Sequence, residues 1–248
     1  MEADGLRMRE WLGGLLAWHG ADAVLDLGCG DGGDLQRLAA LAPGDARLVG
    51  VDSSAKAIEA ARAATAGDAR LEWHAHDVSL GLPFADGAFD AVYSLNLLEC
   101  VPDKAALLRE MARVLRPGGA VVCAHWDWDT QTVDGADKAL VRRIVQAFSD
   151  WQQGWMAASD GWMGRRLWPT FQQSGLFAGH METYTLTNTV YAPGWAGYEQ
   201  VQAFGALARR GLIPPDDYAR FRDDIAAQAA RGEYFYSLTL YVYVGQKL

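Results

Sequence analysis

The chain has 248 residues, half of them hydrophobic, and a formal net charge of −9 at pH 7. This length suits one large α/β domain or a domain with a grafted cap, and the hydrophobic fraction excludes a globally disordered chain. The acidity argues against a nucleic-acid-binding protein, because phosphate binding requires a basic face.

The cysteines and the N-terminal segment predict a soluble cytoplasmic enzyme. Cys29, Cys100 and Cys123 are scattered and form no CxxC pair, so we expect buried thiols and neither a disulfide framework nor a thiolate zinc site. Residues 1–18 lack the basic start and apolar core of a signal peptide. No apolar run reaches the roughly 18 residues that a membrane span needs. We therefore expect neither a membrane nor a nucleic acid as a partner.

The first half of the chain alternates between expected strands and helices. Hydrophobic periodicity, capping residues and Pro-Gly stops predict helices over 1–19, 34–42, 55–66 and 103–115. The intervening apolar runs predict strands over 23–27, 47–51, 70–76, 89–94 and 120–125. Strands that alternate with helices in this way predict a parallel sheet with right-handed crossovers.

Beyond residue 125 tryptophan becomes frequent and helices dominate. We expect helices at about 135–153, 164–174, 196–210 and 215–231, and strands over 182–191 and 234–244. The last strand alternates polar and apolar residues, which indicates two different faces. The organisation that we predict is a single domain over 1–248, with a core over 20–125 and cap insertions over 126–162 and 191–232.

A glycine-rich turn follows the first expected strand. After Val24–Leu27 come Gly28, Gly30 and Gly32, whose spacing permits positive φ angles and lets a ligand approach the backbone. The next helix begins there, so its free N–H groups favour an anion. Because Gly28-x-Gly30-x-x-Gly33 also satisfies the dinucleotide fingerprint, a nicotinamide enzyme stays open at this point.

Two carboxylates follow the next two strands. Asp52 ends the second strand about 20 residues beyond the turn, where a carboxylate can accept both hydroxyl protons of a ribose. NAD enzymes share this feature, and a helix N-cap is the alternative role. Asp77 follows the third strand, where it could accept from an adenine amino group.

Two further motifs carry a family resemblance. They are Leu82-Pro-Phe-Ala-Asp-Gly-Ala-Phe-Asp-Ala-Val-Tyr-Ser94 and Arg113-Val-Leu-Arg-Pro-Gly-Gly119. With the glycine turn and the two carboxylates, in this order, they resemble the class I S-adenosylmethionine (SAM)-dependent methyltransferases, in the branch of the ubiquinone/menaquinone-type enzymes. The resemblance implies an α/β Rossmann-like fold with a seven-stranded, mostly parallel sheet of order 3-2-1-4-5-7-6. Its last strand is antiparallel, helices flank the sheet, and a helical cap holds the acceptor.

The resemblance also implies a set of SAM contacts. Asp26 and the backbone of Gly28, Cys29 and Gly30 would hold the methionine portion. Asp52 would hold the ribose, and Ser53 would flank the adenine. The remaining implied contacts, to the adenine edge and the pocket wall, are Asp77, Val78 and Leu95.

Catalytic candidates lie after the fourth and fifth strands. Many relatives read Ser-Asn-x-x-Leu-Glu-His-Val after the fourth strand, whereas this chain has Cys100 in place of the histidine and keeps Glu99. His125 ends the fifth strand at the ligand-binding edge of the sheet, and Asp127 follows on the same side. We predict Glu99, His125 and Asp127 as acceptor-side residues, with structural roles in a loop or cap as the alternative. We expect no metal, because the chemistry needs none.

The acceptor is the least determined feature. The aromatic residues of the C-terminal half, together with Asp127, Asp129 and Asp160, suit a cationic acceptor, so methylation of an amine is slightly favoured. They equally suit a flat aromatic acceptor. Arg165 or Arg166 could hold a carboxylate, with helix-surface salt bridging as the alternative. An O-methyltransferase, a quinone-type C-methyltransferase, an NAD-dependent dehydrogenase and a non-catalytic SAM-binding protein stay as alternatives.

Overall fold

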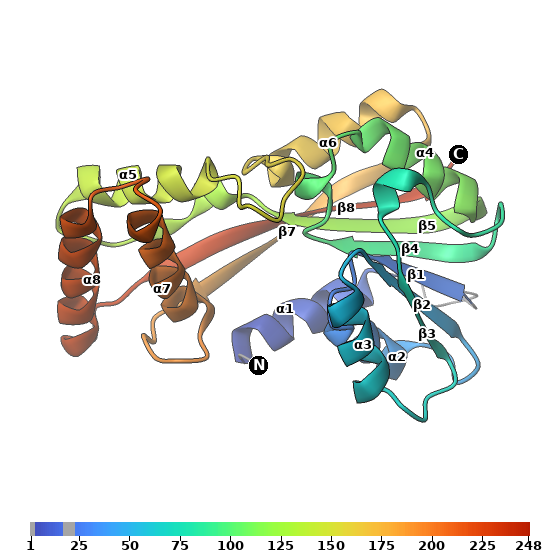
Figure 1. Cartoon of the computed structure of the whole chain (residues 1–248), viewed down its shortest axis with the longest axis horizontal. Coiled ribbons are helices and arrows are strands. Elements are labelled where there is room, and N and C mark those ends of the chain that lie inside the picture. Colours follow the sequence, from blue (N-terminus) through green and yellow to red (C-terminus); the bar gives the residue numbers. More distant parts are fainter. Residues whose placement is uncertain (1–2, 17–22) are drawn as a thin grey trace.

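A computed structural model describes residues 3–16 and 23–248 (Figure 1). Within these residues one sheet of eight strands has the order β3-β2-β1-β4-β5-β8-β6, and β7 also pairs with β8. The strands are β1 (Ala23–Leu27), β2 (Arg47–Asp52), β3 (Leu71–Ala75), β4 (Phe89–Leu95), β5 (Leu115–Trp126), β6 (Thr132–Val133), β7 (Phe177–Asn188) and β8 (Tyr236–Lys247).

The predicted strand order is confirmed, with one strand added. β1 to β5 pair in parallel, and β8 runs antiparallel to both β5 and β7. β7 and β8 are the sixth and seventh strands of the expected order. The added strand is the two-residue β6, which pairs with the start of β8. The cysteines also agree with the prediction, because all three are free thiols and Cys29 and Cys123 are buried.

Helices cover both faces of the sheet and build the cap. They are α1 (Ala3–Gly14), α2 (Gly33–Leu41), α3 (Ala55–Ala64), α4 (Lys104–Val114), α5 (Lys138–Ser149), α6 (Met163–Ser174), α7 (Ala196–Arg209) and α8 (Pro215–Ala230). In Figure 1, α4 and α6 lie on one face, and α1, α2 and α3 lie on the other. The expected first helix reached residue 19, but residues 17–19 lie outside the described part. No helix in the described ranges combines the length and apolarity that a membrane crossing needs.

Three hydrophobic clusters explain this arrangement. One joins α4 and α6 to the sheet through residues such as Leu108 and Phe171, and a second joins α1, α2 and α3 through residues such as Leu12 and Leu35. The third lies within the cap, where α5, α7 and α8 bury Ile144, Phe204 and Ile225 against β8. The two segments assigned to the cap therefore share a core of their own, and α6 between them packs on the sheet.

Two strands are longer than the sequence predicted, for the same reason. β5 begins at Leu115 where we expected residue 120, and β7 begins at Phe177 where we expected residue 182. In both cases the added residues pair with a neighbouring strand. The first β5 pair is Phe89↔Leu115, and the first β7 pair is Phe177↔Lys247. Strand length at these ends is set by the neighbouring strand, which local periodicity does not contain.

Candidate functional site

A cavity of about 670 Å³ lies at the carboxyl edge of the parallel strands. Ligands bind at this edge in open α/β sheets. Six of the nine predicted SAM contacts line it, and they follow four different strands. The lining residues are Gly28, Val51, Asp52, Ser53, Ser54, His76, Asp77, Val78, Leu95, Asn96, Leu97, Cys100, Val101, Trp155 and Ala157.

The glycine turn forms one wall of the cavity. Gly28 and Gly30 have φ angles of 77° and 54°, in the left-handed region that favours glycine. The N–H groups of Gly28 and Cys29 both donate to the carbonyl of Val51, at 2.8 and 3.1 Å, so the turn is fastened to β2. A Cβ at Gly30 would meet no atom within 4 Å, which leaves the backbone open to a ligand.

Gly32 serves packing instead. A Cβ at this position would lie 2.3 Å from the ring of Trp73, so the missing side chain makes room for the tryptophan. Gly50 on β2 faces the same ring, where a Cβ would lie 2.5 Å away. The third glycine of the motif is therefore explained by the core. Gly28 lines the cavity and Gly30 does not, so the predicted contact of Gly30 stays a prediction.

Asp52 connects the turn to the next helix. Its Oδ2 accepts from the N–H of Gly30 at 3.0 Å, and its Oδ1 accepts from the N–H of Ser54 at 2.8 Å. Each carboxylate oxygen keeps a further lone pair for a ligand hydroxyl. Ser54, not Ser53, caps α3, because its hydroxyl accepts from the N–H of Ala57. Ser53 is thus free of the capping role and lines the cavity.

Asp77 lies at the far end of the cavity from the glycine turn. Hydrogen bonding from Ser79 lowers the pKa of its carboxyl below the usual value, so Asp77 is ionised at neutral pH. Val78 beside it is buried and begins the short 3₁₀ helix η1 (Val78–Leu80). A carboxylate that accepts hydrogen bonds suits the amino edge of an adenine ring, and the apolar side chain next to it suits the face of the ring.

Asp26 and Cys29 are placed behind the turn and are absent from the cavity lining. Asp26 is only 2% exposed, and its Oδ2 has no hydrogen-bond partner among the described residues. Burial, together with the nearby charges of Asp34 and Asp52, raises the pKa of Asp26 well above the usual value. Burial likewise raises the pKa of the Cys29 thiol. Both side chains face the interior, so their predicted contact with the methionine portion stays a prediction.

Glu99 and His125 form a buried pair between the cavity edge and the cap. Nδ1 of His125 donates to the carbonyl of Trp126 at 2.8 Å, which leaves Nε2 as a lone pair 3.5 Å from Oε2 of Glu99. The indole N–H of Trp128 donates to the same oxygen at 3.0 Å. Burial lowers the pKa of His125 to about 4 and raises that of Glu99. Glu99 lies in η2 (Leu98–Cys100), which adjoins the cavity, but neither side chain lines it.

Asp127 is engaged by an arginine. Its fully buried carboxylate accepts from Nε and Nη2 of Arg165, at 2.5 and 2.6 Å, and from the N–H of Arg165 at 3.2 Å. A Cβ at Gly164 would lie 2.8 Å from Cβ of Asp127, so this glycine lets α6 start directly against it. The pair fastens the segment after β5 to α6. The proposed role of Asp127 toward an acceptor stays a prediction.

Nine of the lining residues were not predicted as SAM contacts, and Asn96 and Trp155 are two of them. Asn96 follows β4 with a φ of 60°, and it is the one non-glycine residue with a positive φ in the described ranges. Trp155 reaches the cavity from the segment between α5 and α6 and is 71% exposed. Asparagine tolerates the left-handed region, but no sequence pattern requires it there. The position of Trp155 depends on how the cap folds back.

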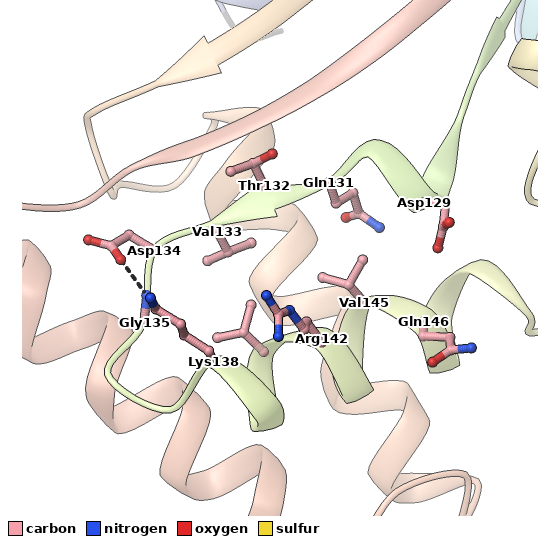
Figure 2. Close-up of a pocket in the computed structure, with 11 residues that line it drawn as sticks. Asp129, Gln131, Thr132, Val133, Asp134, Gly135, Lys138, Arg142, Val145 and Gln146 are labelled. Carbon is pink, nitrogen blue, oxygen red and sulfur yellow. Dashed lines mark hydrogen bonds between the residues drawn. The ribbon is translucent and has the colours of Figure 1, made fainter.

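A second cavity, of about 560 Å³, lies within the cap (Figure 2). Arg142 and Val145 of α5 face Gln131 and Val133 across it, as Figure 2 shows. Asp129, which the sequence assigned to a cationic acceptor, lines it, but none of the predicted SAM contacts does, and none of its lining residues belongs to a cofactor motif. No cluster of three or more metal-ligating side chains was found in residues 3–16 and 23–248. The cavity at the sheet edge is therefore the candidate functional site.

Comparison with known proteins identifies a methyltransferase domain in the first half of the chain. Residues 24–119 match the family model described as a methyltransferase domain. An uncharacterized 37.1 kDa protein in a transposon of Streptomyces fradiae is 33% identical over 229 residues, which cover 91% of this chain and 62% of that protein. The 2-methyl-6-phytyl-1,4-hydroquinone methyltransferase of Synechocystis is 30% identical over 213 residues, which cover 83% of this chain and 63% of that enzyme. The chain thus spans about three fifths of the length of these relatives.

A solved structure shares the fold at lower sequence identity. The geranyl diphosphate C-methyltransferase of Streptomyces coelicolor, in complex with Mg²⁺, geranyl diphosphate and S-adenosylhomocysteine, aligns with a TM-score of 0.57 and 19% identity. The alignment covers 98% of this chain and 77% of that one. The domain match, the strand order and the cavity at the carboxyl edge agree with one another. Residues 24–119 are therefore a methyltransferase domain, and the described chain has the α/β fold of the solved methyltransferase structure.

Proposed function

We propose that this protein is an enzyme that transfers the methyl group of SAM to a small-molecule acceptor. One observation carries the proposal: Gly28 after β1, Asp52 at the end of β2 and Asp77 after β3 surround the same cavity. These positions were matched to the family motif from the sequence, and three separate strands bring them together. The Streptomyces coelicolor enzyme was solved with S-adenosylhomocysteine, which agrees with SAM as the cofactor.

The residues fit SAM in a defined order along the sheet edge. We place the adenine between Asp77 and Val78, the ribose hydroxyls on Asp52, and the methionine portion over the backbone of Gly28. The methionine portion would extend over the neighbouring Gly30, whose backbone no other atom covers at the Cβ position. When bound, SAM supplies a methyl group that is already activated on a sulfonium. The protein then has to position an electron pair in line with that methyl and to exclude water.

A binding experiment tests this assignment. Calorimetry with S-adenosylhomocysteine should detect binding to the wild type, and Asp52→Ala should weaken it by at least about tenfold, because ligand hydrogen bonds to a charged group are lost. Asp45→Ala, at an exposed carboxylate outside the cavity, is the matched control. Binding of NAD without binding of S-adenosylhomocysteine would favour the dehydrogenase. Near-wild-type affinity of Asp52→Ala would mean that the ribose lies elsewhere.

The charges near the cap no longer favour an amine acceptor. Each carboxylate that the sequence assigned to a cation has an arginine beside it. Asp127 pairs with Arg165, Asp129 lies 3.8 Å from the same guanidinium, and Asp160 pairs with Arg166 at 2.8 Å. Arg165 also stacks on the ring of Trp162, with its guanidinium carbon 4.6 Å from the ring centroid. The cationic acceptor therefore loses its main support, and a hydroxyl, carboxylate or quinone-type acceptor gains.

The aromatic residues of the cap mostly pack on one another. Tyr191 contacts the rings of Tyr198 and Tyr234, with centroids 4.9 and 5.0 Å apart, and Tyr236 is buried. Among the aromatic residues that suggested an acceptor cage, Trp155 is the one that lines the cavity. Tyr234 and Tyr236 thus belong to the core of the cap. Trp126, Trp128 and Trp151 pack against it partly buried, and Trp155 and Trp162 are exposed.

A further inference from the structure

Asn96 lies where the methyl group of SAM would end, if the proposed function holds. The sheet order β3-β2-β1-β4-β5 places the adenine end near β3 and β2 and the methionine end near β1. The next strand along the edge is β4, and Leu95, Asn96 and Leu97 form the cavity wall at its end. Beyond it lie β5 and the cap, on the side left for the acceptor.

One half of the Asn96 side chain has a structural role. The N–H of Asn96 donates to the carbonyl of Ala124, and Oδ1 accepts from the N–H of Trp126 at 3.1 Å. β4 turns away at this point, so Oδ1 replaces the strand carbonyl that would otherwise satisfy Trp126. A backbone N–H can only donate, so the accepting atom is the oxygen, and this contact fixes the orientation of the amide.

The other half of the side chain is unused. With Oδ1 bound to Trp126, Nδ2 carries two N–H donors, and no acceptor for them is found among the described residues. Nδ2 is not fully buried. It is accessible in the wall of the cavity, where Asn96 is half-buried. The left-handed φ of 60° holds the amide in this place. Strained backbone of this kind is characteristic of ligand-binding positions.

We infer that Nδ2 of Asn96 donates a hydrogen bond to the reacting oxygen of the methyl acceptor. A fixed N–H donor requires a lone pair, and a phenolate or carboxylate oxygen keeps lone pairs for the donor while another attacks the methyl carbon. The new bond is O–CH₃, and the carbon–sulfur bond breaks with its electron pair going to sulfur. The acceptor arrives as an oxyanion, so no proton has to be removed. A protonated amine has no lone pair to offer this donor.

This inference rests on the proposed function and names its substrate class. Matched acceptor pairs test it: naphthol against naphthylamine, benzoate against benzylamine, and octanoate against octylamine, each with SAM that carries a tritium-labelled methyl. Label should enter oxygen members of the pairs. Label in amines alone, or in no oxygen compound, overturns the inference. Binding of S-adenosylhomocysteine is measured separately by calorimetry. A failure of the proposed function would appear there as absent binding, whatever the labelling result.

Asn96→Asp isolates the donor from the structural role. Aspartate tolerates the left-handed region and keeps an oxygen for the N–H of Trp126, but it replaces the donating NH₂ by an acceptor. We expect the labelling rate of the oxygen acceptors to fall roughly thirtyfold, with unchanged affinity for S-adenosylhomocysteine and unchanged melting temperature. Gln146→Glu makes the same exchange on the exposed face of α5 and should change nothing.

A second variant shows what loss of the structural contact does to stability. Asn96→Gly keeps the positive φ and removes the whole side chain, so it should lower both the labelling rate and the melting temperature. A wild-type labelling rate in Asn96→Asp would overturn the inference. A weakened affinity for S-adenosylhomocysteine in Asn96→Asp, with no separate loss in the rate at saturating cofactor, would place the contact on the cofactor and also overturn it.

Discussion

The cofactor half and the cap use charged side chains in opposite ways. Around the cavity, Asp52 and Asp77 accept from backbone N–H groups and keep lone pairs toward open space. In the cap region, Asp127 and Asp160 are bound by arginines that leave no charge for a ligand. Asp52 and Asp77 therefore keep accepting atoms toward the cavity, whereas Asp127 and Asp160 hold segments of the chain together through arginines.

The largest effect should come from breaking the Asp127–Arg165 pair. Arg165→Met leaves the fully buried carboxylate of Asp127 without its partner, so we expect the free energy of unfolding to fall by about 3 kcal/mol. Denaturant titration measures this change. The affinity for S-adenosylhomocysteine should stay unchanged, because the pair lies outside the cavity.

Two controls sharpen this prediction. Asp127→Asn combined with Arg165→Met removes both charges and should recover part of the lost stability. Arg231→Met breaks an exposed pair with Glu233 and should cost less than about 1 kcal/mol. A stable Arg165→Met variant with altered cofactor affinity would contradict the division between the two halves.

A smaller effect with a distinct pH dependence should come from Asp26. Its pKa is raised in the folded protein, so the folded state holds a proton that the unfolded chain releases above about pH 4. The free energy of unfolding should therefore fall as the pH rises. Asp26→Asn removes this loss, and in the absence of ligand it should be more stable than the wild type at pH 8 by an amount on the order of 1 kcal/mol.

The pH profile decides this prediction. The stabilisation by Asp26→Asn should shrink at pH 5, because the loss of stability that begins near pH 4 has accumulated over a shorter pH interval than at pH 8. Thermal melts across this range measure it. Asp45→Asn, at an exposed carboxylate, is the control. A stabilisation that stays constant with pH would mean that Asp26 is ionised in the folded protein. Asp26 would then behave like the paired carboxylate of the cap.

The smallest effect should come from Trp155, the aromatic residue from the cap segment that reaches the cofactor cavity. Its exposure predicts a weak contact, so Trp155→Ala should reduce the affinity for S-adenosylhomocysteine by about threefold. Calorimetry measures the affinity, and Trp168→Ala on α6, outside the cavity, is the control. A loss much larger than this would mean that the cap segment closes over the cofactor.

Most of the cofactor site could be predicted from the sequence, because each motif residue directly follows a strand. Gly28, Asp52, Asp77 and Leu95 all lie at strand ends, and parallel strands bring their carboxyl ends to one edge. Asp26 and Cys29 stand in the same motif, but their side chains face inward. The alternation of side chains along a strand distinguishes inward-facing residues from cavity-lining residues only when it is known which face meets the ligand.

The acceptor side could not be predicted in this way. Asn96 needs its φ of 60° and the N–H of Trp126 before its amide points anywhere in particular. From the sequence, Asp127 was expected to be a free carboxylate. In the structure, Arg165, 38 residues later, donates hydrogen bonds to it. These contacts join residues that are far apart in the chain, and no local pattern encodes them.

By itself, the sequence predicted the methyltransferase domain, the order of the strands and the glycine turn beside the cavity. Spacing suffices for these features, because glycine conformations, helix caps and strand ends are local properties of the backbone. Only the tertiary structure decided which cap charges were already paired, why Gly32 makes room for Trp73, and that Trp126 holds the amide oxygen of Asn96. Those answers depend on which partners reach each polar group, and packing alone determines that.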